Sequence, residues 1–250
     1  MYSLQKAGAL KRFSAYLCDI ILLFIIIIGV ASLLSLALNY DSYSDKLDEL
    51  WGKYQAEYGI DINKDYNSLT PEEKAVYDAA YKALGADPEA AYNYQMMFNL
   101  SLIIGTFSIL IAYVILEFIV PLIFKNGQTL GKKVFGIGVM RVDGVKITTP
   151  ILFIRTILGK FTIETMIPVL MILMLYFSAI GLMGVIVTAL IIIFNIGLLI
   201  ATKTNSAIHD ALSQTVTVDM TSQLIFNSTE EMIEYKQRIH AEEANKASYF

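Results

Sequence analysis

Three long apolar runs constrain this chain more than any other feature of its sequence. They cover Phe13 to Leu38, Met96 to Phe124 and Ile167 to Ile200. A bilayer core takes about 20 consecutive apolar residues per helix, so each run is long enough to cross it. The composition agrees, because 56% of the residues are hydrophobic and 17% are charged, whereas soluble domains carry about 25% charged residues. The sequence therefore predicts an all-α, multi-pass membrane protein whose first partner is the lipid bilayer.

The third run decides the number of spans, because it is too long for a single helix. It can be extended to 151–201 and cut at Tyr176 to Ser178, which gives two helices and four membrane spans in all. The alternative keeps 151–166 as an interfacial helix and leaves three spans. The first run spans some 25 residues and lacks a small-residue cleavage site, so we expect it to be retained as a membrane helix.

The charges of the connecting segments predict how the chain is oriented. The segment Asn39 to Gln95 holds twelve acidic residues against five lysines, whereas Lys125 to Lys160 holds seven basic residues against Asp143. Basic loops stay in the cytoplasm during insertion. We therefore expect a cell-membrane protein with a cytoplasmic N-terminus and an acidic extracytoplasmic insertion.

These patterns divide the chain into six segments. The insertion should be helical, because Thr70, Pro71 and Glu73 form the start signal of a helix. Asp143 and Gly144 are flanked by strand-like residues and predict a small cytoplasmic β-hairpin, formed by 134–142 and 145–149. The segments are the N-terminal part with the first helix (1–38), the insertion (39–95), the second helix (96–124), the basic hairpin (125–150), the third and fourth helices (151–201) and the cytoplasmic tail (202–250).

Charged residues inside the apolar runs are the candidates for function. Arg12 and Asp19 are two turns apart on one face of the first helix, with the small Ala15 between them leaving room for a group from another helix. An aspartate in an apolar run needs a partner, whereas Arg12 also fits a simple anchor that reaches lipid phosphates. Asp210 follows the last span, and four spans would bring it to the same side of the membrane.

Glu117 is a further candidate, because it ends a polar stripe of Asn99, Thr106 and Tyr113 on the second helix. Intramembrane carboxylates are functional candidates by default. The stripe itself, like Gly181, Thr188, Asn195 and Thr202 on the last helix, also fits ordinary polar packing between helices. Arg155, at the start of the third helix, and His209, beside Asp210, are secondary candidates.

Several functional classes are not supported by the sequence. Cys18 is the only cysteine, so no disulfide can form within the chain. Together with the only two histidines, His209 and His240, it supplies fewer cysteine and histidine ligands than the four of a structural zinc site. Gly127 to Lys133 is one residue short of a phosphate-binding loop and lacks its Ser/Thr. We expect no catalytic residues, no metal, no cofactor and no nucleic-acid partner.

Three blocks of sequence resemble the RDD family of bacterial membrane proteins, which is named for one arginine and two aspartates. The blocks are Arg12 to Asp19, Gly127 to Lys133 with Asp143 and Gly144, and Ile208 to Val218. The sequence departs from the family pattern at Gln214, where a glycine usually precedes the threonine, and in its long insertion. The resemblance implies a membrane domain without established catalytic machinery, for which transport and ion or proton exchange have been suggested.

Two hypotheses follow for function. In the first, Asp19, Asp210 and Glu117 bind a monovalent cation or a proton, Arg12 tunes their ionisation, and the small bundle works as an oligomer. In the second, the chain is a membrane-embedded structural or accessory protein that engages a partner membrane protein, and the charged residues fix helix register. Both hypotheses predict that Arg12, Asp19 and Asp210 form one cluster at the cytoplasmic end of the bundle.

Overall fold

A computed structural model describes residues 4–61, 64–176 and 182–247 of the chain. Four of its helical stretches are long and apolar enough to cross a membrane, namely Ala9–Ala37, Pro88–Phe124, Thr149–Tyr176 and Leu182–Ala201. The predicted four-span, helical fold is confirmed. Because Thr149–Tyr176 is one stretch of 28 residues, 151–166 is not a separate interfacial helix. The predicted break at 176–178 lies partly outside the described residues.

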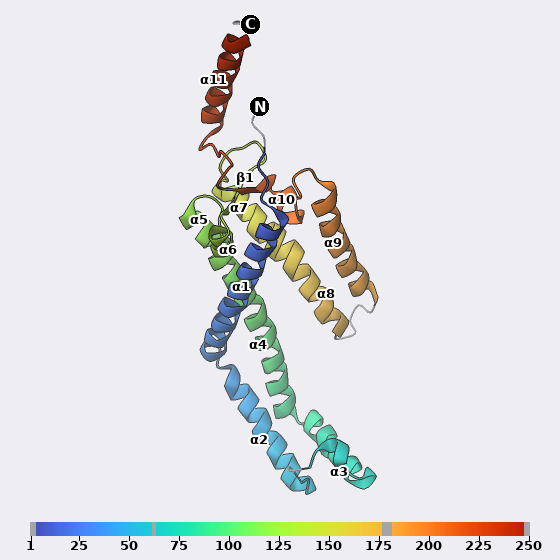
Figure 1. Cartoon of the computed structure of the whole chain (residues 1–250). Helices are drawn as coiled ribbons and strands as arrows, with labels where there is room; N and C mark the ends of the chain where they lie inside the picture. The colour runs from blue at the N-terminus through green and yellow to red at the C-terminus, as the bar shows by residue number, and fades with distance from the viewer. Residues whose placement is uncertain (1–3, 62–63, 177–181, 248–250) are drawn as a thin grey trace. The chain divides into compact units, whose positions relative to one another are not determined.

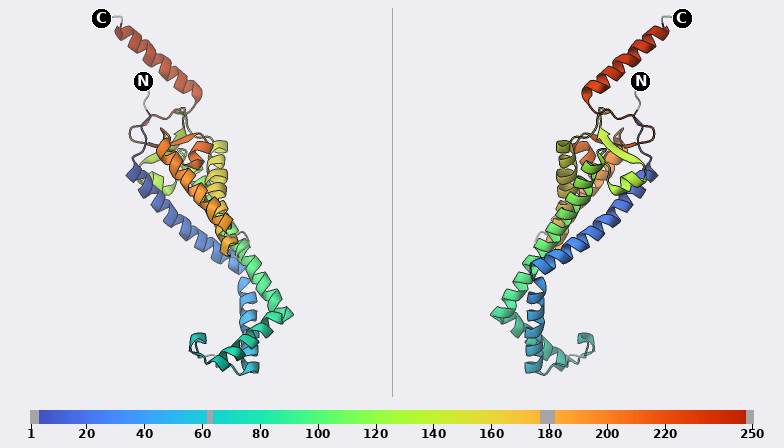
Figure 2. Two further views of the ribbon diagram at one scale, coloured as in Figure 1. Left: turned by 90° about the vertical axis from the view of Figure 1, so that its right-hand side faces the viewer. Right: turned by 90° about the vertical axis from the view of Figure 1, so that its left-hand side faces the viewer.

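The chain forms two compact units, which we describe separately. The first comprises 1–25 and 110–250, and the second comprises 26–109. Helices α1 (Ala9–Ala37) and α4 (Pro88–Tyr113) contribute to both. The second unit otherwise consists of α2 (Tyr40–Tyr58), the short turn η1 (Tyr66–Ser68) and α3 (Pro71–Ala86), with α2 packed beside α3 (Figure 2).

The start of α3 follows the predicted signal. The Thr70 hydroxyl accepts from the Glu73 N–H, the Glu73 carboxylate accepts from the Thr70 N–H, and Pro71 occupies the first turn. This reciprocal cap satisfies backbone N–H groups that a helix start leaves free. The Trp51 ring on α2 meets the Tyr77 ring edge-on, with ring centroids 5.3 Å apart. The insertion is therefore a helical hairpin held by aromatic packing.

Two of the spans contain π-helical segments. The second span continues from α4 through η2 (Val114–Ile119) to α5 (Val120–Phe124), and the third runs from α7 (Thr149–Phe153) through η3 (Ile154–Met166) to α8 (Ile167–Tyr176). A proline follows two residues after each π-segment, at Pro121 and at Pro168. Proline has no N–H to give the carbonyl four residues before it, so the α-helical ladder is interrupted there.

The remaining elements of the first unit are the fourth span and the elements between and after the spans. They are α6 (Leu130–Val134), β1 (Ile137–Arg141), α9 (Leu182–Ala201), α10 (Ile208–Leu212), β2 (Thr215–Asp219) and α11 (Thr229–Ala247). Helix α9 packs against α8, and α10 packs against η3 (Figure 1). The short helix α10 thus lies against the third span.

The predicted β-hairpin is wrong in its strand pairing. A two-stranded sheet is present, but β1 pairs antiparallel with β2, so that Val139 faces Thr217. The turn at Asp143 and Gly144 forms as predicted, yet the returning segment reaches β1 only at an isolated bridge between Met140 and Lys146. The reason is burial, because β2 carries apolar side chains that complete a core. Val216 and Val218 are buried with Met140, and this burial of apolar side chains stabilises the pairing of β1 with β2.

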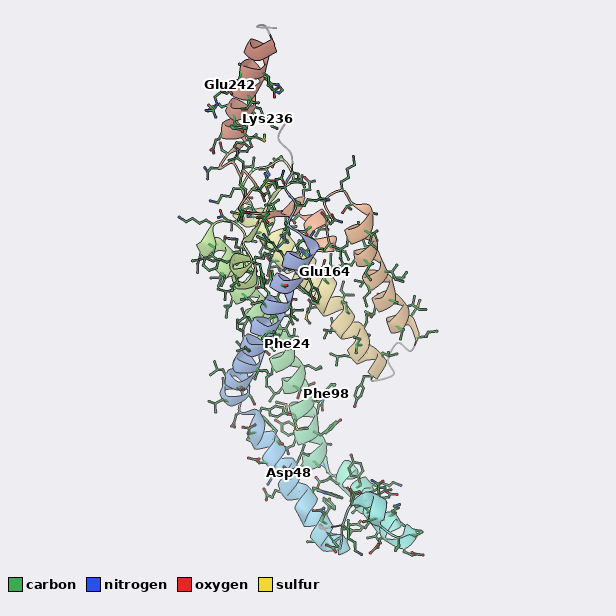
Figure 3. All side chains as sticks on the ribbon, viewed as in Figure 1. Phe24, Asp48, Phe98, Glu164, Lys236 and Glu242 are labelled. Carbon is green, nitrogen blue, oxygen red and sulfur yellow. The ribbon has the colours of Figure 1, made fainter. Side chains whose placement is uncertain are left out.

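The sheet brings the beginning and the later part of the chain together. The Ala7 N–H donates to the Thr217 carbonyl at 3.3 Å, and Lys6 forms a bridge with Val218. We call this region the polar end of the first unit: the first three turns of α1, the segment from α5 to α7, and the segment from α9 to β2. Side chains crowd together there, whereas Lys236 and Glu242 on α11 lie outside the crowded region (Figure 3).

Candidate functional site

Asp210 lies on the short helix α10 and is held by two arginines from other elements. Its Oδ1 accepts from Arg155 Nη2 at 2.7 Å and from Arg155 Nε at 3.1 Å. Its Oδ2 lies 3.8 Å from Arg12 Nη2. The Asp210 and Arg155 side chains are each 2% exposed, and that of Arg12 is 20% exposed. The predicted pairing of Arg12 with Asp210 is therefore present, but the secondary candidate Arg155 supplies the closer and more buried partner.

The same carboxylate is tied to the start of β2. Thr215 Oγ1 donates to Asp210 Oδ1 at 3.2 Å. Burial alone would raise the pKa of Asp210, but Arg155, His209 and Arg12 lower that pKa well below its usual range. Asp210 is thus a permanent anion at neutral pH, fixed by charge-assisted hydrogen bonds.

His209, the other secondary candidate, connects α10 to η3. Its backbone N–H donates to Glu164 Oε1 at 2.9 Å, and its ring Nδ1 lies 2.8 Å from Glu164 Oε2. Burial lowers the pKa of His209, so the ring is neutral at pH 7 and donates its Nδ1 proton to the carboxylate. Glu164 lies on η3, in the crowded part of Figure 3. We name Asp210, Arg155, Arg12, His209 and Glu164 the Asp210 cluster.

Asp19 does not join that cluster, so the prediction of a single cluster is wrong. Asp19 Oδ2 accepts from the Thr129 hydroxyl at 2.5 Å, and its Oδ1 accepts from the Gly131 N–H at 2.8 Å. Thr129 caps α6, and Gly131 is in its first turn. The start of α6 thus supplies a backbone N–H and a capping hydroxyl, which satisfy the Asp19 carboxylate without an arginine.

The space beside Ala15 is filled by α6, as the small side chain predicted. A Cβ atom on Gly131 would lie 2.4 Å from the Ala15 carbonyl and 2.8 Å from Asp19 Oδ1. Only glycine therefore permits this approach of α6 to α1. A similar contact occurs at Gly159 on η3, where a Cβ atom would lie 2.6 Å from His209 Cβ.

Glu117 is buried and lies between two lysines. Its Oε2 accepts from Lys160 Nζ at 2.6 Å and lies 3.8 Å from Lys132 Nζ. Glu117 is on η2, Lys160 is on η3 and Lys132 is on α6. The three side chains therefore connect the two spans that contain π-helical segments with the short helix α6. The Glu117 backbone carbonyl, which Pro121 leaves without its α-helical donor, accepts from the Thr156 hydroxyl at 2.9 Å. Glu117 thus faces protein rather than lipid.

Lys132 links Glu117 with Asp19. Its Nζ also lies 3.4 Å from Thr129 Oγ1, the hydroxyl that donates to Asp19. Burial lowers the pKa of Lys132 to about 8, and the attraction of Glu117 opposes this only in part. A lysine in such surroundings releases its proton far more readily than one in water. We name Glu117, Lys160, Lys132, Thr129 and Asp19 the Glu117 cluster.

Sequence reasoning missed the lysines and Thr129. A basic loop residue is ordinarily read as an orientation signal, and nothing in the spacing indicates that Lys132 turns inward. The available signal was Glu117 itself, since a buried carboxylate requires cations nearby.

Tyr113 and Asn195 of the predicted polar stripes take part in packing between elements, whereas Asn99 and Thr106 are exposed. Tyr113 and Thr165 hydroxyls are 2.8 Å apart between the second and third spans, and Asn195 Oδ1 accepts from the Ile208 N–H at 3.2 Å, which fastens α10 to α9. Gly181 lies outside the described residues.

Comparison with known proteins gives one match. The family model described as the RDD family matches residues 6–214, which include both clusters and the insertion. Neither the search of curated proteins nor the search of solved structures returned a match.

Proposed function

Because this chain belongs to the RDD family and buries a lysine between two carboxylates, we propose that it exchanges protons for monovalent cations across the membrane. The observation that carries the proposal is the position of Lys132, 3.8 Å from Glu117 and hydrogen-bonded to the hydroxyl that donates to Asp19. The pKa of Lys132, lowered to about 8, lies near physiological pH, where a group can both gain and lose a proton.

The exchange follows from charge balance in the Glu117 cluster. With Lys132 protonated, two ammonium groups balance the carboxylates of Glu117 and Asp19. When Lys132 loses its proton, it becomes a neutral amine and one carboxylate charge is unbalanced, so that a sodium or potassium ion can bind beside Glu117 and restore the balance. Protonation of Lys132 restores the balance and expels the ion. One proton therefore leaves for each cation that binds, with no change in net charge.

The π-helical segments support a working site rather than inert packing. Such segments are rare and occur often at functional sites. Here they carry Glu117 on η2 and Lys160 on η3, so the two spans that meet the cation would do so through their least regular turns. The exposed apolar faces of the four spans are available for lipid and for a second copy of the chain.

The Asp210 cluster has a different part in this proposal. Asp210 keeps its charge at neutral pH and is already neutralised by Arg155 and Arg12, so it offers little to a cation. We assign it to holding α1, η3 and α10 together around the exchanging site.

Ion flux in proteoliposomes tests the proposal. Purified protein is reconstituted with a pH indicator inside the vesicles, and sodium or potassium is added outside. We expect a cation-dependent pH change that Glu117→Gln reduces at least tenfold, while Lys133→Gln, a change of the neighbouring exposed lysine, retains it. Equal flux in the wild type and in a folded Glu117→Gln protein would refute the assignment of the site.

A second function has its own support. Both clusters are charge-balanced, and a fully paired network also suits a membrane-embedded structural or accessory protein that engages a partner. Folded wild-type protein that moves neither sodium, potassium nor protons in the same vesicles would favour this accessory function.

A further inference from the structure

A small cavity lies apart from both clusters, at the ends of the second and third spans. Its volume is about 190 Å³, and it is enclosed by the end of α5, the loop at Gly127 and the start of α7. Gly127 has a positive φ of 61°, and a Cβ atom there would lie 3.0 Å from Val139 Cβ. The loop is therefore held closely against β1, which gives the cavity a fixed wall.

The polar lining of the cavity is cationic. Lys125, Lys146, Thr148 and Thr149 all line the cavity. Among the described residues, neither ammonium group has a carboxylate within ion-pair distance, whereas Lys132 and Lys160 both pair with Glu117. The nearby Asp143 is engaged by Arg141 at 2.5 Å. Two lysines and two threonine hydroxyls form a donor set suited to a phosphate group.

Apolar side chains continue from the cavity along the spans. Leu122 and Leu152 line it, and the neighbouring Ile123 and Phe153 are 66% and 46% exposed. On a span these side chains face acyl chains. A ligand that fits both surfaces carries an anionic phosphate at one end and hydrocarbon at the other.

We propose that this cavity binds the phosphate headgroup of an anionic phospholipid, with the acyl chains lying along the exposed sides of α5 and α7. Basic pockets between membrane helices at the cytoplasmic face commonly bind such headgroups. The site is distinct from the Glu117 cluster and does not depend on ion exchange.

Lipid titration of the purified full chain in a neutral detergent tests the assignment. The probes are phosphatidylglycerol, phosphatidylcholine and inorganic phosphate, and the readouts are the binding constant and the melting temperature. We expect phosphatidylglycerol to bind and to raise the melting temperature, and Lys125→Gln with Lys146→Gln to weaken that binding on the order of tenfold or more. The matched control is Lys133→Gln with Lys203→Gln, which removes two exposed charges outside the cavity and should change binding less than twofold.

Three results would overturn the proposal. Equal weakening by both double variants would indicate general electrostatic attraction. Equal binding of phosphatidylcholine, whose choline cation cancels the charge of its phosphate, would show that the site does not select an anionic lipid. Lysine-dependent binding of inorganic phosphate as tight as that of phosphatidylglycerol would identify a soluble anion as the occupant. A double variant that fails to fold is replaced by Lys125→Arg with Lys146→Arg, which keeps the charges and should retain binding.

Discussion

At the scale of single residues, Asp210 shows how unequal two cationic partners of one carboxylate can be. Arg155 donates two hydrogen bonds to it from a fully buried position, while Arg12 approaches no closer than 3.8 Å and remains partly exposed. A buried charge that loses its partner costs much more than an exposed one, because water cannot replace the lost contacts. Arg12 is easy to recognise as a candidate in the sequence, but we expect it to contribute less than Arg155 to the free energy of unfolding.

We predict that Arg155→Ala destabilises the protein by about 3–5 kcal/mol and Arg12→Ala by about 1 kcal/mol. Denaturant unfolding in detergent measures both values. Arg141→Ala, which breaks the partly exposed pair with Asp143, serves as the control and should cost less than about 1 kcal/mol. Combining Arg155→Ala with Asp210→Asn should cost less than the sum of the single changes. A larger loss for Arg12→Ala than for Arg155→Ala would contradict this account.

A second residue, Gln214, is in an energetically unfavourable conformation in the structure. Its φ of 51° is in the left-handed region, which favours glycine. The turn is retained nonetheless, because the Val142 N–H donates to the Gln214 carbonyl at 3.0 Å. Gln214 thus has a left-handed backbone conformation that is costly for a residue other than glycine, and its carbonyl still accepts a hydrogen bond.

Gln214→Gly should stabilise the protein by about 1 kcal/mol, because it removes left-handed strain without removing a backbone hydrogen bond. The melting temperature in detergent reports the change. Ser222→Gly, at an exposed position without a positive φ, should not stabilise it. A loss of stability in Gln214→Gly would show that the glutamine side chain contributes more than the strain costs.

At the scale of elements, the sequence was sufficient to predict a helix or strand wherever a single local pattern determined that element. The apolar runs predicted four spans, and the Thr70 capping signal predicted the start of α3. It was insufficient where two segments competed for a partner: Asp143 and Gly144 specify a turn, but the buried valines of β2 specify the strand that pairs with β1. The predicted partner of Asp19 was wrong for the same reason. Thr129 and Gly131 compete with Arg12 for the Asp19 carboxylate, and only tertiary structure decides between them.

The contact of α6 with α1 gives an element-scale prediction. Gly131→Ala should destabilise the protein by about 1–3 kcal/mol, because the new methyl group overlaps the Ala15 carbonyl and Asp19 and must push the helices apart. Thermal unfolding measures the loss. Gly29→Ala is the matched control on α1, where a Cβ atom meets nothing within 4 Å, and it should be neutral or stabilising. A neutral Gly131→Ala would contradict the close approach.

For the whole molecule, the charge contrast between the insertion and the basic segment 125–160 predicts sidedness. In a Cys18→Ser background, a cysteine replacing the exposed Ser68 should react with an impermeant thiol reagent on intact cells. A cysteine replacing the exposed Ser222 should react only after the membrane is permeabilised. Labelling of both positions in intact cells would contradict an even number of spans, and labelling of Ser222 alone would reverse the orientation.

The central claim is that Lys132 gives up its proton when a cation binds beside Glu117. Calorimetric titration of the purified protein with sodium or potassium at pH 7, in buffers of different ionisation enthalpy, measures the protons released per cation bound. At this pH Lys132, whose pKa is lowered to about 8, is mostly protonated, so the account predicts release of close to one proton. Release should fall as the pH is raised above 8, where the proton is already lost, and it should disappear in Lys132→Gln but persist in Lys133→Gln. Cation binding without proton release, or unchanged release in Lys132→Gln, would contradict it.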